Sequence, residues 1–258
     1  MEVITSRQNA LVKSLKKQID SRRARRESGQ VIAEGIHLFE IQRSVGVIPE
    51  LIVIADRCRS KPEIAALIDL SPASRIVVLS DDIFDQIAPA DTPSGLLTVG
   101  NEPVADPGDL QSVDTLVLDR VQDPGNVGSL IRTAVAAGVR QIVMSTGCAD
   151  PWSPRCLRAG QGAQWLAKVF TEVDLNTFLR NFSGAVAATV LNGGSSLYEH
   201  ALTQVTAWLF GNEGQGVDPQ LIAYATQRIT IPMPGGMESL NVNAAAAVCL
   251  FEQVRQRR

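Results

Sequence analysis

Residues 114–145, DTLVLDRVQDPGNVGSLIRTAVAAGVRQIVMS, decide the fold of this chain. The segment begins with an apolar run typical of a buried strand, and it turns at an Asp-Pro-Gly triplet. A helix is predicted over 126–137, and the apolar run 141–145 predicts the next strand. A strand, a helix and a second strand in this order are the unit from which parallel sheets are built.

The same alternation continues toward the C-terminus. Further helices are predicted at 153–163, 175–182, 218–225 and 241–256, and further strands at 165–170, 185–190, 206–211 and 228–232. We therefore expect an α/β domain with a mostly parallel sheet that helices cover on both faces.

A second α/β unit is predicted toward the N-terminus. Its predicted strands are 31–34, 51–55, 75–80 and 95–100, and its helices include an amphipathic one with Leu11, Leu15 and Ile19 on one face and a stop at Gly29. The segment NEPVADPGDLQS is polar and contains two prolines and a glycine, as linkers often do. The expected organisation is a first domain at 1–100, a linker at 101–112 and a second domain at 113–258.

Composition excludes several classes of protein. The chain has 258 residues, of which 45% are hydrophobic and 20% charged, which is ordinary for a globular protein and excludes collagen-like and wholly disordered chains. No apolar run approaches the roughly 20 residues that span a bilayer, and the N-terminus lacks a signal-peptide core. Four widely spaced cysteines and only two histidines argue against a disulfide framework or a metal site. A cytoplasmic location is expected.

Positive charge is concentrated at the N-terminus. Residues 1–26 contain eight basic residues and two acidic ones, whereas the whole chain has a net charge of -3. This asymmetry favours an arm that binds a polyanion, although a solvated charged helix would have the same composition.

Residues 119–138 form the first of three loop segments that follow predicted strands. Asn126 is a natural N-cap for the helix that carries Arg132. Gly125 and Gly128 allow backbone N–H groups to approach an anionic ligand closely. Such loops collect at the carboxyl ends of parallel strands, where ligands bind. Taken alone, the Asp-Pro-Gly turn is equally consistent with a simple chain reversal.

The other two segments lie further along the chain. LFGNEGQGV (209–217) places three glycines around Glu213, but it is neither a P-loop nor a dinucleotide fingerprint, because the required lysine and glycine spacings are absent. ITIPMPGGMESLNVNAAAAVCLFEQ (229–253) is a proline- and glycine-rich loop that leads into an alanine-rich helix, which suggests close helix packing. Buried amides need partners, so Asn241 and Asn243 are predicted to be cap or site residues.

Together and in this order, DPGNVGSLIRTA, LFGNEGQGV and IPMPGGMESLNVNAAAAVCLFE resemble the three motifs of the SpoU (TrmH) family of RNA 2′-O-ribose methyltransferases, in the SPOUT superfamily. The segments ITSRQNALVKSLKK and VIAEGIHLFEI resemble that family's substrate-binding domain, so the resemblance covers the whole chain. It implies an α/β fold with an N-terminal domain like an RNA-binding ribosomal protein and a C-terminal SPOUT domain with a deep trefoil knot. It also implies S-adenosylmethionine as cofactor, RNA as partner, no metal, and a homodimer with the active site formed across it.

The resemblance assigns residues position by position. It implies catalytic roles for Asn126, Arg132, Glu213, Ser239 and Asn241. It implies cofactor contacts, largely through backbone groups, at Thr189, Gly211, Ile231 and Leu240. RNA contacts are expected from Lys13, Lys16, Lys17, Arg22 and Arg23 of the basic segment, and from Arg158, which matches an arginine that handles the RNA phosphate or ribose.

The implied reaction is in-line transfer of the sulfonium methyl group to a ribose 2′-hydroxyl, which must lose its proton. Arg132 is the family's usual candidate for this step, yet a guanidinium is effectively always protonated. Two interpretations stay open. Either Arg132 is unusually deprotonated within the dimer, or it anchors the target phosphate while another group accepts the proton.

The leading hypothesis is therefore an S-adenosylmethionine-dependent 2′-O-methyltransferase that acts on 23S rRNA, because relatives with a separate N-terminal domain typically modify rRNA. The alternatives are a tRNA 2′-O-methyltransferase and a knotted RNA-binding protein without catalytic activity. The joint presence of Asn126, Arg132, Glu213 and Asn241 argues against the inactive protein. A Rossmann-type nucleotide-binding enzyme is remote, since its glycine fingerprint is absent.

Overall fold

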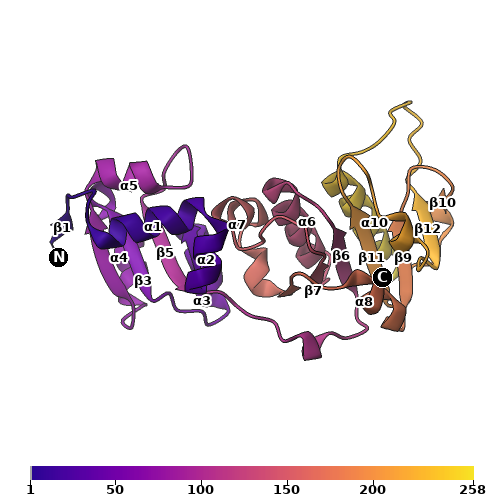
Figure 1. The fold of residues 1–258 in the computed structure, drawn as a ribbon, viewed down its shortest axis with the longest axis horizontal. Helices are drawn as coiled ribbons and strands as arrows, with labels where there is room; N and C mark the ends of the chain where they lie inside the picture. The colour runs from indigo at the N-terminus through magenta and orange to yellow at the C-terminus, as the bar shows by residue number, and fades with distance from the viewer. Residues whose placement is uncertain (1) are drawn as a thin grey trace. The chain divides into compact units, whose positions relative to one another are not determined.

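The computed structural model describes residues 2–258 and divides them into two compact units. The first unit contains the chain up to Pro103 together with Asp150–Trp165, and the second contains Val104–Ala149 and Leu166–Arg258. Residues 150–165, which the sequence places inside the second domain, thus pack with the first unit. Figure 1 traces the elements of both units along the chain.

A five-stranded mixed sheet forms the centre of the first unit. Its strand order is β1-β4-β3-β5-β2, with β1 (Val3–Ile4), β4 (Arg75–Leu79), β3 (Leu51–Ala55), β5 (Leu96–Asn101) and β2 (Gln30–Glu34). The first three strands run parallel, and β5 pairs antiparallel with both β3 and β2. The central strands are rich in Val and Ile, which suits strands that are buried on both faces.

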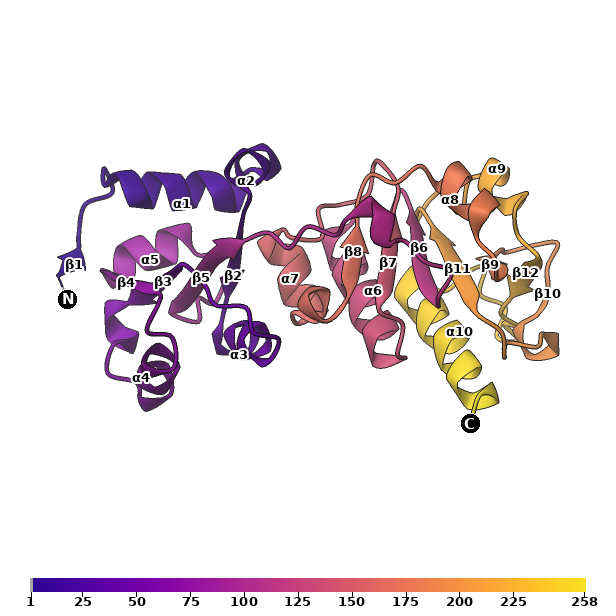
Figure 2. The ribbon, with the colours of Figure 1, turned by 90° about the horizontal axis from the view of Figure 1, so that it is seen from below.

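Helices cover this sheet on both sides (Figure 2). They are α1 (Ala10–Asp20), α2 (Arg22–Ser28), α3 (Ile36–Ser44), α4 (Pro62–Asp69) and α5 (Asp81–Ile87), with α7 (Pro154–Gly160) packed against β2. On the predicted apolar face of α1, Leu15 is buried in the core of the unit, and Leu11 and Ile19 pack partly buried against it; Val12, which was not predicted on this face, is also buried. The single helix predicted up to Gly29 is interrupted at Ser21, which is in extended backbone, and so forms α1 and α2. Gly29 ends α2 at a φ of 64°, at the predicted stop.

A buried ion pair fastens residues 150–165 to α2. The Nη2 atom of Arg25 lies 2.6 Å from Oδ2 of Asp150, and the two side chains are only 6% and 14% exposed. The Nη1 atom of Arg25 also donates to the carbonyl oxygen of Gln18 at 2.8 Å. Arg25 therefore belongs to the core of the unit, although it lies within the basic run.

A seven-stranded, wholly parallel sheet forms the second unit, in the order β10-β12-β9-β11-β6-β7-β8. The strands are β10 (Ser195–Ser196), β12 (Gln227–Thr230), β9 (Ala185–Thr189), β11 (Thr206–Gly211), β6 (Thr115–Asp119), β7 (Gln141–Met144) and β8 (Lys168–Phe170). Figure 2 shows α6 (Pro124–Ala136) and α10 (Val242–Gln256) on one face of this sheet, and α8 (Leu175–Asn181) and α9 (Pro219–Ile222) on the other. The predicted parallel sheet with helices on both faces is thus confirmed.

Several predicted boundaries are wrong. Trp165 and Leu166 were predicted to start a strand, but they lie in the 3-10 helix Ala163–Leu166. This turn follows Gly162, at a φ of 78°, and Trp165 packs against Trp152. The predicted helix 218–225 is limited to α9, and the two-residue strands β1 and β10 were not predicted. The other 3-10 helices are Asp56–Cys58, Pro107–Asp109 and Leu197–Glu199. Within residues 2–258, no helix combines the length and apolarity needed to cross a membrane.

Candidate active site

The candidate site begins at the first turn of α6, which follows β6. Asp123 is the N-cap of this helix, and its Oδ1 atom accepts a hydrogen bond from the backbone N–H of Asn126 at 2.9 Å. The prediction that Asn126 is the N-cap is therefore wrong. Pro124 fits the first helical position because its missing N–H is not needed there, and this moves the cap back to Asp123. The Asn126 side chain is left available for other contacts.

The loop after β11 brings a carboxylate to the same place. The backbones of Asn212 and Gly216 exchange two hydrogen bonds of 3.1 and 2.8 Å, which closes a tight turn. A Cβ atom at Gly211 would lie 2.2 Å from the carbonyl carbon of Gly216, so this position requires glycine. The Nδ2 atom of Asn212 donates to the carbonyl oxygen of Arg120 at 3.0 Å, which ties the loop to the end of β6.

Glu213 lies in this turn and contacts the start of α6. Its Oε1 atom accepts a hydrogen bond from Nδ2 of Asn126 at 2.9 Å, and weaker contacts come from the backbone N–H groups of Asp123 at 3.4 Å and Gln122 at 3.5 Å. Partial burial by itself raises the pKa of the Glu213 carboxyl, but the hydrogen bonds from Asn126 and the backbone outweigh it and lower this pKa below its usual value. Glu213 is thus an ionised carboxylate at neutral pH.

The start of α10 completes the network. Asn241 is the N-cap of this helix, and its Oδ1 atom accepts from the backbone N–H of Asn243 at 2.9 Å. The Nδ2 atom of Asn243 donates to Oδ1 of Asn126 at 2.6 Å. Since α10 packs along α6, residues from all three sequence motifs meet in one chain of hydrogen bonds, from Asn243 through Asn126 to Glu213.

The remaining predicted catalytic residues lie outside this network. Arg132 is exposed, about 120° round α6 from Asn126, and its guanidinium has no hydrogen bond or ion pair with any residue of the described 2–258. Ser239 is exposed in the loop before α10, and the side-chain oxygen of Asn241 is engaged in its cap. The sequence missed the role of Asp123, although an Asp-Pro pair before a helical segment is a recognisable cap signal.

The residues predicted to hold the cofactor lie along one edge of the parallel sheet. Thr189 and Gly211 are the last residues of β9 and β11, and Ile231 follows β12; these three strands are neighbours in the sheet. In the loop that follows β12, Leu240 and Met237 are 41% and 71% exposed. The carboxyl ends of parallel strands, followed by a loop with exposed apolar side chains, fit a ligand with an apolar adenine ring and polar edges.

The residues predicted to contact RNA are mostly on the surface of the first unit. Lys13, Lys17, Arg22 and Arg23 are exposed on α1 and α2, and Arg158 is exposed on α7. Lys16 is half-buried and forms an ion pair with Asp20 at 3.3 Å, and Arg23 pairs with Glu27 at 2.7 Å. Lys13 and Lys17 have no ion pair within the described part of the chain.

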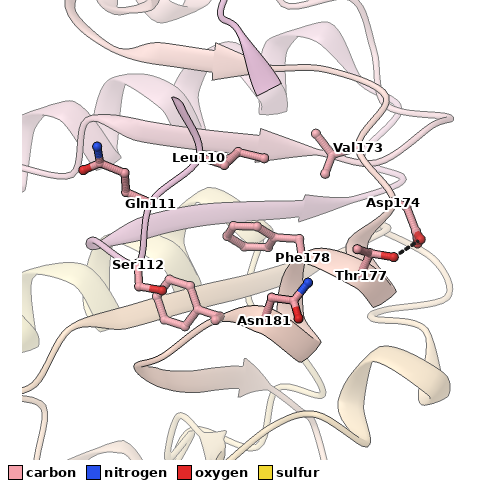
Figure 3. A pocket seen from close by; sticks show the side chains of 9 residues that line it. Leu110, Gln111, Ser112, Val173, Asp174, Thr177, Phe178 and Asn181 are labelled. Atoms are coloured by element: carbon pink, nitrogen blue, oxygen red, sulfur yellow. Dashed lines mark hydrogen bonds between the residues drawn. The ribbon is translucent and has the colours of Figure 1, made fainter. Parts of the chain in front are cut away.

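Two cavities of the second unit lie elsewhere. One of about 390 Å³ is lined by the chain near Leu110 and by Phe178 and neighbouring side chains of α8, as Figure 3 shows. The other, of about 370 Å³, lies at the ends of β6 and β7 around Arg120. None of the predicted site residues lines either cavity. The described residues contain no group of three or more His, Cys, Asp or Glu side chains placed to hold a metal ion.

Comparison with known proteins identifies the two parts of the chain. Residues 114–251 match the SpoU rRNA methylase family, and residues 9–98 match the MRM3-like substrate-binding domain. This chain belongs to the SpoU rRNA methylase family. The family, the enzyme class and the dependence on S-adenosylmethionine that the sequence implied are thereby confirmed.

Relatives of this SpoU-family chain match it over nearly its whole length. The 23S rRNA (guanosine(2553)-2′-O)-methyltransferase RlmP of Bacillus subtilis is 32% identical, with 97% of this chain and 98% of the relative covered. An uncharacterised tRNA/rRNA methyltransferase of Synechocystis is also 32% identical, with 98% and 94% covered. The AdoMet-bound rRNA methyltransferase from Sinorhizobium meliloti has a TM-score of 0.86 at 25% identity, with 98% and 97% covered.

Proposed function

We propose that this chain transfers a methyl group from S-adenosylmethionine to a ribose 2′-hydroxyl of 23S rRNA. The observation that carries the proposal is the hydrogen-bonded chain from Asn243 through Asn126 to Glu213, which joins three segments far apart in the sequence. The names of the relatives support both the reaction and the substrate, since RlmP is a 23S rRNA guanosine 2′-O-methyltransferase.

The carboxyl ends of β9, β11 and β12 are the proposed place for the cofactor. S-adenosylmethionine supplies an electrophilic methyl group on a sulfonium. Thr189, Gly211, Ile231 and Leu240 would hold its adenosine, with backbone donors and acceptors reading the adenine edge.

The target ribose is proposed to bind against one surface of the site, which is formed by Asn126, Glu213, Ser239 and Asn241. Because the pKa of Glu213 is lowered, its carboxylate is a weak base, and its role is to orient the Asn126 amide rather than to accept the proton. Holding the 2′-hydroxyl in line with the methyl group supplies much of the rate enhancement in such a transfer.

Arg132 is proposed to anchor the phosphate of the target nucleotide. Its guanidinium is exposed and has no partner among residues 2–258, and a planar guanidinium binds phosphate through two parallel hydrogen bonds. Its separation from the Glu213 network favours this role over that of a deprotonated base.

RNA is proposed to bind along α1 and α2 of the first unit. The exposed cations Lys13, Lys17, Arg22 and Arg23 lie on one short stretch of chain, and they would contact phosphates without reading sequence. Arg158 would contact the same RNA from α7. Recognition of a 2′-hydroxyl requires RNA rather than DNA.

Family membership also underlies three proposals about architecture: a trefoil knot in the second unit, a ribosomal-protein-like fold in the first, and a homodimer. Exposed Phe251 on α10, at 48%, is an apolar residue that a partner subunit would cover. Light scattering should then give about twice the chain mass of 27.7 kDa; a monomer that retains full activity would contradict the dimeric site.

The test is transfer of labelled methyl from S-adenosylmethionine to unmodified 23S rRNA, 16S rRNA and tRNA transcripts, and to purified ribosomal subunits. Label on 23S rRNA alone is the expected result. Label on tRNA instead would establish the tRNA alternative. No label on any RNA or particle, with cofactor binding intact, would establish the inactive RNA-binding alternative.

A further inference from the structure

Asn243 lies in the first turn of α10. Its side chain contacts the oxygen of the Asn126 amide, whereas Glu213 contacts the nitrogen of the same amide. We propose that Asn243 is a positioning residue that fixes which end of the Asn126 amide faces Glu213. The expected change in methyl-transfer rate rests on the proposed function. The expected change in the Glu213 pKa can be measured without any RNA.

The orientation of the Asn126 amide follows from hydrogen-bond polarity. An ionised carboxylate can only accept hydrogen bonds, so Asn126 must present its NH2 group to Glu213, as the 2.9 Å contact shows. The oxygen of the Asn126 amide then faces the opposite way, and only a donor can satisfy it there. Asn243 supplies that donor through its Nδ2 atom at 2.6 Å.

Asn243 itself keeps an unsatisfied atom in this arrangement. Its Oδ1 atom is buried and has no hydrogen-bond partner among the described residues. A buried acceptor without a partner is rare in folded proteins. Rotating the Asn243 amide would leave its NH2 group in that position and place two oxygens against each other at Asn126. The fold therefore tolerates one unpaired acceptor and keeps the donor directed at Asn126.

The backbone that carries the Asn243 donor is held by two further contacts. The N–H of Asn243 is held by the cap side chain of Asn241 at 2.9 Å, and α10 packs along α6. Among the contacts to the Glu213 carboxylate, the Asn126 amide is the shortest, at 2.9 Å against 3.4 and 3.5 Å for the backbone donors. Asn243 thus acts on Glu213 through the strongest hydrogen bond that this carboxylate receives.

The test compares Asn243→Asp, which is nearly isosteric but places an acceptor opposite the Asn126 oxygen, with Asn243→Ala, which removes the donor without adding charge. Asn181→Asp, at an exposed position of α8, is the control with the same chemical change. Carbon-13 NMR of labelled glutamate, assigned with Glu213→Gln, reports the Glu213 pKa, and single-turnover methyl transfer reports the rate.

We expect the Glu213 pKa to rise in both Asn243 variants, most in Asn243→Asp, and not in the control. The rate constant should fall at least tenfold in Asn243→Asp and less in Asn243→Ala, with the cofactor dissociation constant changed less than threefold. If Asn243→Asp fails to fold, the Glu213 pKa in Asn243→Ala alone tests the proposal. An unmoved Glu213 pKa in a folded Asn243→Ala variant would overturn the proposal. Wild-type protein that is inactive on every RNA, with the pKa shift intact, would instead count against the proposed function.

Discussion

The paired helices α1 and α2 and the network around Asn126 are both polar, but they use their polar groups in different ways. Lys13 and Lys17 extend into solvent, with no ion pair in the described chain. By contrast, both ends of the Asn126 amide are engaged, one by Glu213 and one by Asn243. The helix pair would act through its charge, which many side chains can share, whereas the network acts through orientation, which a single substitution can destroy.

Two arginines sharpen this contrast. Arg25 lies in the basic run but is 6% exposed and paired with Asp150, so it serves the fold. Arg132 lies on the same helix as Asn126 but outside the network, and it is exposed and has no partner within residues 2–258. Charge in the sequence alone therefore does not separate a structural arginine from one that is available to a substrate.

Replacement of Arg132 should have the largest effect. Arg132→Ala is expected to lower single-turnover methyl transfer about a thousandfold, because the charged contact proposed to anchor the target phosphate is lost. The melting temperature should be unchanged, since Arg132 makes no contact that the fold needs. Transfer within tenfold of wild type would contradict the assignment of Arg132 to the active site.

Replacement of Arg25 should instead lower the free energy of unfolding. Arg25→Ala leaves the largely buried Asp150 without its partner, at a cost of about 3 kcal/mol. Urea unfolding followed by tryptophan fluorescence measures this, because Trp152 and Trp165 both lie in the first unit. The matched control is Arg23→Ala, which removes an exposed helix pair and should cost about 0.3–0.5 kcal/mol. Equal losses in the two variants would mean that Arg25 contributes no more to the fold than Arg23 does.

Removal of two exposed charges should change RNA binding moderately. Lys13→Gln combined with Lys17→Gln is expected to weaken RNA binding and to reduce the slope of log affinity against log salt by about 1.5, because two phosphate contacts are lost. Methyl-donor binding should not change. Lys168→Gln, which removes one exposed charge from the second unit, is the control and should leave the slope unchanged. An unaltered slope in the double variant would mean that α1 is only a solvated face.

Acidification should have the smallest effect, a loss of the stability that the ionised Glu213 contributes. Because the pKa of Glu213 is lower in the folded protein than its usual value of 4.5, the ionised group stabilises the fold at neutral pH. That contribution is complete above about pH 4.5 and is lost as the pH falls through the lower folded value. The difference in melting temperature between wild type and Glu213→Gln should therefore shrink on acidification. A difference that grows toward low pH would mean that the Glu213 pKa is raised.

The sequence predicted the fold where local signals and packing agree. The apolar spacing of α1, the Gly29 stop and the β6-α6-β7 alternation all reappear in the structure. Predictions failed where distant packing overrides local preference. Trp165 and Leu166 belong to an apolar run that predicts a strand, yet they lie in the 3-10 helix that follows Gly162.

The candidate site shows the same limit. Asn126 and Glu213 could be singled out from motif composition, but their contact depends on Asp123 taking the helix cap. Asn243 could be recognised only as a polar residue that needs a partner, because its partner lies 117 residues away in the sequence. Such pairings are set by the packing of α10 on α6, which no local sequence pattern specifies.

Locating the labelled methyl group within the RNA decides whether the reaction is a ribose 2′-O-methylation. After methyl transfer to 23S rRNA, one position should resist alkaline cleavage, since a 2′-O-methyl group blocks attack on the neighbouring phosphate. A ligated 23S rRNA with 2′-deoxyribose at that single nucleotide should accept no methyl group. Label that persists on the deoxy substrate, or that leaves the backbone sensitive to alkali, would place the methyl group on a base and rule out 2′-O-methylation.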